Sequence, residues 1–196
     1  MPHETPSATR TATIEPLYEA AALRGSVAEL AKQMTDDFGE MEPLLLAILG
    51  GSLIFLADLV RAIDRPVRYE LIQVGYSEGD TVEPGESREA PEAREKVQNI
   101  HYPIPVEIAG RSVVVVKDVV ASGVIEVYLA EKLRQHEARE VRFAALIDMP
   151  DERKTEFKVD YSAFTTQRHG ILVGYGMKHE GRYGNLPYIG RLPSHA

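Results

Sequence analysis

The segment Arg111–Ala130, RSVVVVKDVVASGVIEVYLA, decides the fold that we expect for this chain. Its four consecutive valines, Val113–Val116, are typical of a strand buried on both faces of a parallel sheet. The small residues 121–123 then form a short turn, and apolar side chains at helical spacing predict a helix over Val124–His136. A strand, a turn and a helix in this order direct backbone N–H groups and the positive end of the helix dipole toward an anion, usually phosphate. The same order occurs in crossovers of many α/β proteins, so this segment alone leaves the anion site open.

Strands and helices alternate through the rest of the sequence. Hydrophobic periodicity predicts a helix over 27–38, which is the first regular element of the chain, and a second helix over 53–63. Short apolar or alternating runs predict strands at 44–49, 67–74, 141–147 and 171–175, with a further alternation at Phe157, Val159 and Tyr161. This order indicates an α/β fold with a central, mostly parallel twisted sheet flanked by helices, in which ligands bind beyond the carboxyl ends of the strands.

The composition narrows the class of partner. The net charge of −8 argues against nucleic acid and against an anionic membrane surface. The chain has no cysteine, which excludes disulfides and thiolate metal sites and agrees with the cytoplasmic location that we expect. No apolar run approaches the roughly 18 residues of a membrane span. Residues 1–13 lack the apolar core of a secretory signal, so we expect a disordered tail there and a single domain over 14–196.

An acidic segment separates the two halves of the predicted sheet. Residues 75–100 carry seven acids and three bases, with glycine and proline between them. The segment is either a lid over a site or a solvated face, and charge runs of this kind favour the solvated face.

Three stretches together resemble the hypoxanthine-guanine phosphoribosyltransferases, which have the type I phosphoribosyltransferase fold. They are AILGGSLIFLADLVRAI at 47–63, VVVVKDVVASG at 113–123 and ILVGYGMKHEGRYGNLPYIGRL at 171–192. The resemblance spans Val27 to Leu192. It implies a small hood built from the chain's ends and a purine salvage enzyme that joins a purine base to phosphoribosyl pyrophosphate, with magnesium, and releases pyrophosphate. It also implies a homodimer or homotetramer that associates through the helix after the first glycine loop.

The central motif departs from the family pattern where its chemistry resides. The family has two adjacent acids that hold the ribose hydroxyls through magnesium, and this chain has Lys117 and Asp118. The family's aspartate near the purine, credited with acid/base assistance, is Ala121, which cannot move a proton. The resemblance therefore gives no catalytic residue at position 121.

The pyrophosphate side departs as well. The family has a lysine in its first loop, and this chain has Gly50 at that position, followed by Gly51. Lys178 stands where the family has its second magnesium-binding aspartate, and Gly184 stands where the family has an arginine that binds pyrophosphate. Lysines oppose a dication, which prefers carboxylate oxygens, yet two lysines could replace the metal as direct phosphate partners.

The phosphate and purine subsites are better kept. The resemblance assigns the phosphate to the loop Ala121, Ser122, Gly123, Val124 and Ile125, where one hydroxyl of the family pattern survives and another is lost. It assigns the purine to Lys158, Ile171 and Leu172. Lys158 matches the lysine that donates to the exocyclic oxygen of the base, although the residue type alone fits a surface lysine on an edge strand equally well.

Three interpretations follow. The first, which we favour, is a protein that binds a purine nucleotide or another phosphorylated small molecule without a cofactor, with transfer lost or strongly impaired. The second is an active transferase with altered substrates or an unusual magnesium site. The third is a non-catalytic regulatory or subunit-pairing protein. Leu53, Phe55, Leu56 and Leu59 give the helix 53–63 more apolar surface than one face needs, so they either form a subunit interface or all pack inside the monomer.

Overall fold

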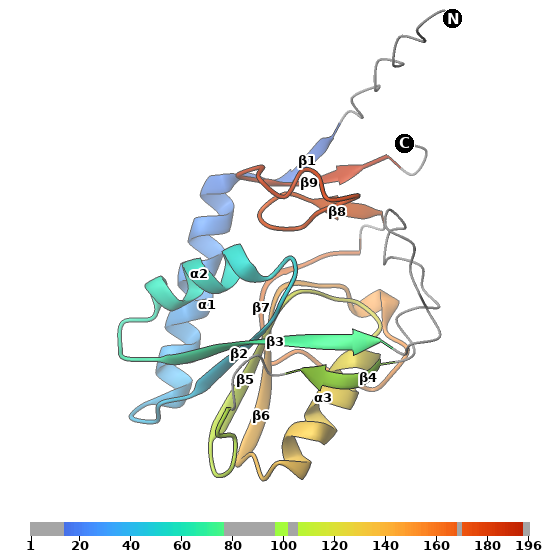
Figure 1. Ribbon diagram of the computed structural model, residues 1–196. Helices are drawn as coiled ribbons and strands as arrows, with labels where there is room; N and C mark the ends of the chain where they lie inside the picture. Colours follow the sequence, from blue (N-terminus) through green and yellow to red (C-terminus); the bar gives the residue numbers. More distant parts are fainter. Residues whose placement is uncertain (1–13, 77–96, 102–105, 168–169, 194–196) are drawn as a thin grey trace, which may run out of the picture.

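The computed structural model describes residues 14–76, 97–101, 106–167 and 170–193 (Figure 1). The predicted tail 1–13 and most of the acidic segment 75–100 lie outside these residues. The elements are β1 Glu15–Tyr18, α1 Ala20–Phe38, β2 Leu44–Ile48, α2 Leu53–Ala62, β3 Arg68–Tyr76, β4 Val97–His101, β5 Ser112–Val120, α3 Val124–Gln135, β6 Glu140–Asp148, a 3₁₀ turn Pro150–Glu152, β7 Tyr161–Thr165, β8 Ile171–Val173 and β9 Ile189–Leu192.

The larger sheet has the strand order β4-β3-β2-β5-β6-β7. The five strands β3, β2, β5, β6 and β7 run parallel, and the edge strand β4 is antiparallel to its neighbour β3. Strand β5 lies between β2 and β6, with Val114 opposite Leu45 and Arg142. All four residues of Val113–Val116 have no exposed surface, which confirms the prediction of a central strand covered on both faces.

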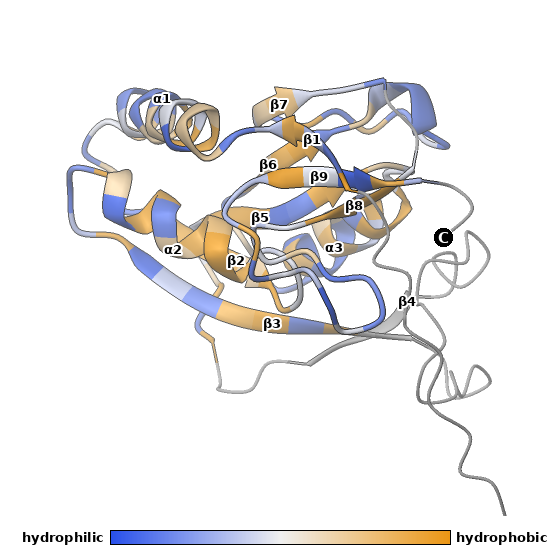
Figure 2. Cartoon of the chain, turned by 90° about the horizontal axis from the view of Figure 1, so that it is seen from above, coloured by the Kyte–Doolittle hydropathy of each residue, from blue (hydrophilic) through white to orange (hydrophobic). Residues whose placement is uncertain are grey.

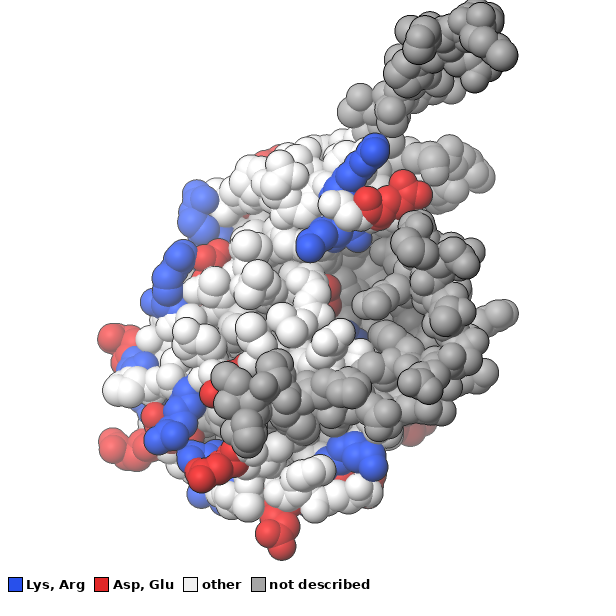
Figure 3. Space-filling model, viewed as in Figure 1, with Lys and Arg blue, Asp and Glu red and all other residues white. Residues whose placement is uncertain are grey.

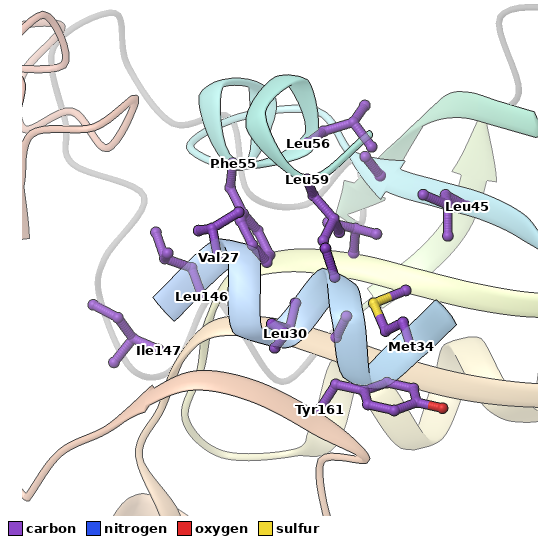
Figure 4. Packing of buried hydrophobic residues seen from close by; sticks show 14 of the residues in the cluster. Val27, Leu30, Met34, Leu45, Phe55, Leu56, Leu59, Leu146, Ile147 and Tyr161 are labelled. Carbon is purple, nitrogen blue, oxygen red and sulfur yellow. The ribbon is translucent and has the colours of Figure 1, made fainter. Parts of the chain in front are cut away.

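Helices cover both faces of this sheet. On one face, α1 and α2 pack on alternate residues of β2, β5 and β6, among them Leu45, Val114 and Leu146. Figure 4 shows Val27, Leu30 and Met34 of α1 near Phe55 and Leu59 of α2 in this layer. On the other face, α3 packs on the intervening strand residues. Figure 2 shows hydrophilic and hydrophobic residues alternating along α1, as expected for a helix with one buried face.

A small antiparallel sheet, which we call the hood, is formed by β1, β9 and β8 in that order. Strand β1 pairs with β9, with Glu15 opposite Arg191, so the two ends of the described chain meet there (Figure 1). The hood had been implied by the resemblance, and its strand β1 had no signal in the sequence pattern.

Several boundaries differ from the sequence-based predictions. Strand β1 precedes the first helix, and α1 begins at Ala20 rather than at position 27, because only Leu23 marks its buried face in the first turns. The alternation at 157–161 does not form a strand over its length, because β7 begins only at Tyr161. Strand β8 ends at Val173, since Gly174 has φ 95° and leaves the extended region.

On the face shown in Figure 3, lysines and arginines alternate with aspartates and glutamates, and uncharged residues occupy much of the centre. None of the helices in the described part of the chain combines the length and apolar character needed to span a bilayer.

Candidate functional site

The turn between β5 and α3 is built around a glycine at which any side chain would be strained. Gly123 has φ 81°, and a Cβ there would lie 2.4 Å from Thr155 Oγ1 and 3.0 Å from Phe157 Cβ. Gly123 is also the N-cap residue of α3 and has no side chain, and among the first-turn N–H groups that of Val124 donates to Ser122 Oγ at 3.4 Å. The predicted phosphate loop 121–125 therefore presents backbone donors and the positive end of the α3 dipole, as anion sites at helix N-termini do.

This loop is braced by residues that follow β6. Arg153 donates through Nη1 to the carbonyl of Ala121 and is paired through Nη2 with Asp148. The backbone N–H of Lys154 donates to the carbonyl of Ser122 at 2.9 Å. These contacts hold the main chain of the loop, so its shape does not depend on the acid that Ala121 replaces.

Lys117 lies under α3 and is paired with an acid. It is on the same face of β5 as Val113 and Val115, which pack against α3. Its Nζ bonds Oε1 of Glu126 in the first turn of the helix. The side chain of Lys117 is 15% exposed and that of Glu126 is 1% exposed, so the pair is largely withdrawn from water. The charge of Lys117 is therefore compensated within the protein.

Asp118 points to the opposite face of β5 and meets the first loop. A Cβ on Gly51 would lie 2.1 Å from Asp118 Oδ2 and 3.0 Å from Met177 Cγ, so only glycine allows this approach. Asp118 Oδ1 accepts a hydrogen bond from the N–H of Val119 at 2.9 Å. The structure thus brings Gly51 of the first loop close both to Asp118 near the end of β5 and to Met177 in the connection 174–188 between β8 and β9, which we call the hood turn. Gly50, with φ 145°, is exposed beside this contact.

In the hood turn, Lys178 and Gly184, the two positions that differ from the family pattern, pack against each other. The N–H of Gly176 donates to the carbonyl of Gly184 at 2.9 Å, and a Cβ on Gly184 would lie 2.8 Å from Lys178 Cγ. A Cβ on Gly176 would lie 2.6 Å from the carbonyl oxygen of Gly51. The stem of Lys178 therefore occupies space beside residue 184, and the turn sits directly on the first loop.

The three predicted purine residues lie at two places. Lys158 is exposed in the connection before β7, one residue after Phe157, which contacts the phosphate loop. It does not lie on an edge strand, which was the alternative from residue type. Ile171 and Leu172 lie on β8 in the hood, opposite Leu192 and Arg191, and Leu172 is part of the core.

A groove of about 520 Å³ on another part of the surface was not expected from the sequence. It lies between α1, α2 and residues 184–187, and Gly184 is its one predicted site residue. The Tyr175 hydroxyl donates to Asp58 Oδ2 at 2.5 Å in its wall, and burial together with this bond raises the pKa of Tyr175. No sequence signal marked the groove, because it depends on the early turns of α1.

The described residues supply one carboxylate, Asp118, at the family's acidic positions, whereas a magnesium ion also binds through substrate phosphates and waters. Within the described part of the chain there is no group of three or more histidines, aspartates and glutamates that could hold a metal. Asp118 has Gly51 beside its carboxylate, and the family's second acid position is occupied by Lys178.

Comparisons with known proteins agree with this arrangement. The family model described as "Phosphoribosyl transferase domain" matches residues 14–180. The hypoxanthine-guanine phosphoribosyltransferase of Streptococcus pneumoniae is 34% identical over 164 residues, 84% of each chain. That of Bacillus subtilis is 31% identical over 176 residues, 90% of this chain and 91% of the relative.

Solved structures show the same fold. A hypoxanthine-guanine phosphoribosyltransferase from Bacillus anthracis superposes with a TM-score of 0.79 at 31% identity, covering 91% of this chain and 98% of the other. A variant of the hypoxanthine phosphoribosyltransferase from Trypanosoma cruzi, complexed with its product IMP, gives 0.78 at 25% identity, covering 96% and 94%.

Proposed function

Since this chain belongs to the hypoxanthine-guanine phosphoribosyltransferase family, we propose that it binds a purine nucleotide or a related phosphorylated ligand and has lost most magnesium-dependent transfer. The observation that carries the proposal is a contrast within β5 and its following loop. The main chain of the loop has a glycine turn and braced carbonyls that suit an anion, while all but one of the acids that the family pattern uses for transfer are replaced beside it.

The binding half of the proposal rests on backbone chemistry. The first-turn N–H groups of α3 are donors whatever side chains follow, so the exchange of a hydroxyl residue for Ile125 costs one contact and leaves the others. The Ser122 hydroxyl is also present in the loop. The relative from T. cruzi binds IMP, a purine nucleoside monophosphate, and we extend that class of ligand to this chain.

The loss of transfer rests on missing charge. Ala121 has no proton to exchange, and Asp118 is the single carboxylate left at the family's acidic positions, so a magnesium ion would take its other oxygen ligands from substrate or water. Loss of one preorganised group costs about 2–4 kcal/mol of transition-state stabilisation. Two such losses slow a reaction by roughly three orders of magnitude or more, although losses within one cooperating site do not add fully.

An active transferase with an altered metal or substrate is the second candidate. The observation that favours it is the match over nearly the whole chain to relatives named as transferases. A pairing protein without ligand is the third, favoured by the exposed apolar residues Leu53 and Ile54 on α2.

Calorimetric titration with IMP and GMP, each with and without magnesium, tests the proposal. We expect both nucleotides to bind and magnesium to change their affinity little. Gly123→Ala should abolish binding, because its Cβ meets Thr155 and φ 81° disfavours a side chain. Gly110→Ala is the matched control, because Gly110 has φ 72° with nothing within 4 Å of a Cβ. Absence of binding by the unmodified protein would refute the proposal, and pyrophosphate release at an ordinary rate would favour the active transferase.

A further inference from the structure

We propose that Lys117 and Glu126 act as a coupled positioning pair that keeps the phosphate loop open to an anion, without either side chain touching the ligand. The inference rests on the proposed function, because it concerns the phosphate affinity of the β5–α3 loop. Neither charge alone would have this positioning role, because each residue needs the other to be neutralised.

The first step is the position of Glu126. It is in the first turn of α3, and its side chain is 1% exposed. A carboxylate there interacts favourably with the positive end of the helix dipole. The same charge repels a phosphate that approaches the same helix end, so an uncompensated Glu126 would compete with the ligand for the dipole.

The second step is the partner that removes this competition. Lys117 Nζ bonds Glu126 Oε1 from below, since Lys117 lies on the face of β5 that packs against α3. The pair neutralises the carboxylate and holds it toward the sheet. The N-cap residue Gly123 has no side chain, so the first-turn N–H groups are not capped by an acid.

The third step concerns the acid that the family pattern would put at position 117. A carboxylate there would face the buried carboxylate of Glu126, and two like charges withdrawn from water repel strongly. Substitution of Lys117 by an acid is therefore tolerated only if Glu126 changes too. The two positions are energetically coupled, and Lys117 is committed to this pair rather than to a ligand phosphate.

A double-mutant cycle on the full chain separates this role from direct contact with phosphate. The variants are Lys117→Met, Glu126→Gln and both together, and the titrants are IMP and the nucleoside inosine. We expect Lys117→Met to weaken IMP binding about tenfold or more and to leave inosine binding within about threefold. The double variant should recover IMP affinity to within about threefold of the unmodified protein.

The outcomes are distinct. If the double variant binds IMP as weakly as Lys117→Met, Lys117 contacts the phosphate itself and the pair has no positioning role. If Lys117→Met weakens IMP and inosine equally, its effect is general loss of structure, which also overturns the inference. If Lys117→Met does not fold, the exchange Lys117→Glu with Glu126→Lys replaces it and should bind IMP, whereas Lys117→Glu alone should not. If the unmodified protein binds no nucleotide, the proposed function fails, and the inference falls with it.

Discussion

In the hood turn the side chain of Lys178 fills the space that a side chain at Gly184 would need: a Cβ added to Gly184 would lie 2.8 Å from Lys178 Cγ. The family pattern has an aspartate and an arginine at these two positions, so the two departures compensate each other sterically. Lys117 and Glu126 compensate each other electrostatically in a similar way. Paired compensation of this kind indicates that the altered site is a packed and stable arrangement.

Gly184→Arg should consequently be destabilising while Lys178 is present. We expect the free energy of unfolding to fall by about 1–3 kcal/mol, the usual cost of overpacking, and the double variant Lys178→Asp/Gly184→Arg to recover part of it. Denaturant titration measures both. Gly25→Arg is the control, because nothing lies within 4 Å of a Cβ on that residue of α1. An unchanged stability for Gly184→Arg alone would contradict the packing described for this turn.

The hydrogen bond from Tyr175 to Asp58 should stabilise the hood on α2. Tyr175→Phe removes the bond, and Asp58 keeps its ion pair with Arg61, so the loss should be about 1 kcal/mol. Chemical denaturation at neutral pH measures it. No change in stability would show that water replaces the bond fully.

The same tyrosine gives a pH dependence with a defined sign. Burial and the bond to Asp58 raise the pKa of Tyr175 in the folded state, so the folded protein keeps the phenol proton that the unfolded chain releases near about pH 10. Stability should therefore fall as the pH rises above about 10, by up to roughly 1.4 kcal/mol per unit. The free energy of unfolding of Tyr175→Phe should fall less steeply with pH in this range. Equal slopes for the variant and the unmodified protein would contradict the prediction.

The sheet could be predicted from the sequence because its strands are short apolar runs. Val113–Val116 is the clearest case, since a strand covered on both faces has no polar alternation to confuse it. Strand β1 could not be predicted, because its four residues are exposed or half-buried and gain their order from pairing with β9, far away in sequence. The start of α1 was lost for a related reason, since its first turns bury little besides Leu23.

The sequence singles out candidate site residues, but it does not give the contacts that these residues make. The loop 121–125 was expected to accept an anion, and its glycine requirement agrees with a close approach by Thr155 and Phe157. Lys117 was expected as an opponent of metal or a partner of phosphate, and the structure adds a bond to Glu126 that the sequence did not indicate. Such a pairing depends on which face of β5 carries Lys117 and on the height of α3 above it. The sequence indicates which face of β5 carries Lys117, but it does not give the height of α3 above the sheet.

Assembly through α2 is the next prediction. Phe55, Leu56 and Leu59 are buried inside the monomer, while Leu53 and Ile54 are 50% and 40% exposed. We expect a homodimer or homotetramer through this face, and Leu53→Glu should produce monomers. Val127→Glu is the control, because Val127 is 47% exposed on α3, on the opposite side of the sheet. Light scattering at micromolar concentration gives the mass, and a monomeric unmodified protein would contradict the prediction.

The last prediction concerns transfer itself. Pyrophosphate release from phosphoribosyl pyrophosphate with hypoxanthine, guanine or xanthine should be absent or lower by about three orders of magnitude or more than the ordinary turnover of enzymes. Lys117→Glu with Ala121→Asp returns two acids to the site but creates two facing carboxylates at 117 and 126, so we expect little gain and lower stability. Adding Glu126→Gln removes that repulsion, and the triple variant should release pyrophosphate faster than the double one with magnesium present.

The comparison of these two variants is the decisive measurement, because they differ only at Glu126, a buried residue whose partner in the unmodified protein is Lys117. Equal rates for the double and triple variants would show that the charge at 126 has no influence on the site. Turnover near about one per second by the unmodified protein would show that the present residues suffice for transfer. The loop glutamates of 77–96 would then be the first residues to replace in search of the missing metal ligands, since the described residues supply no cluster of acids.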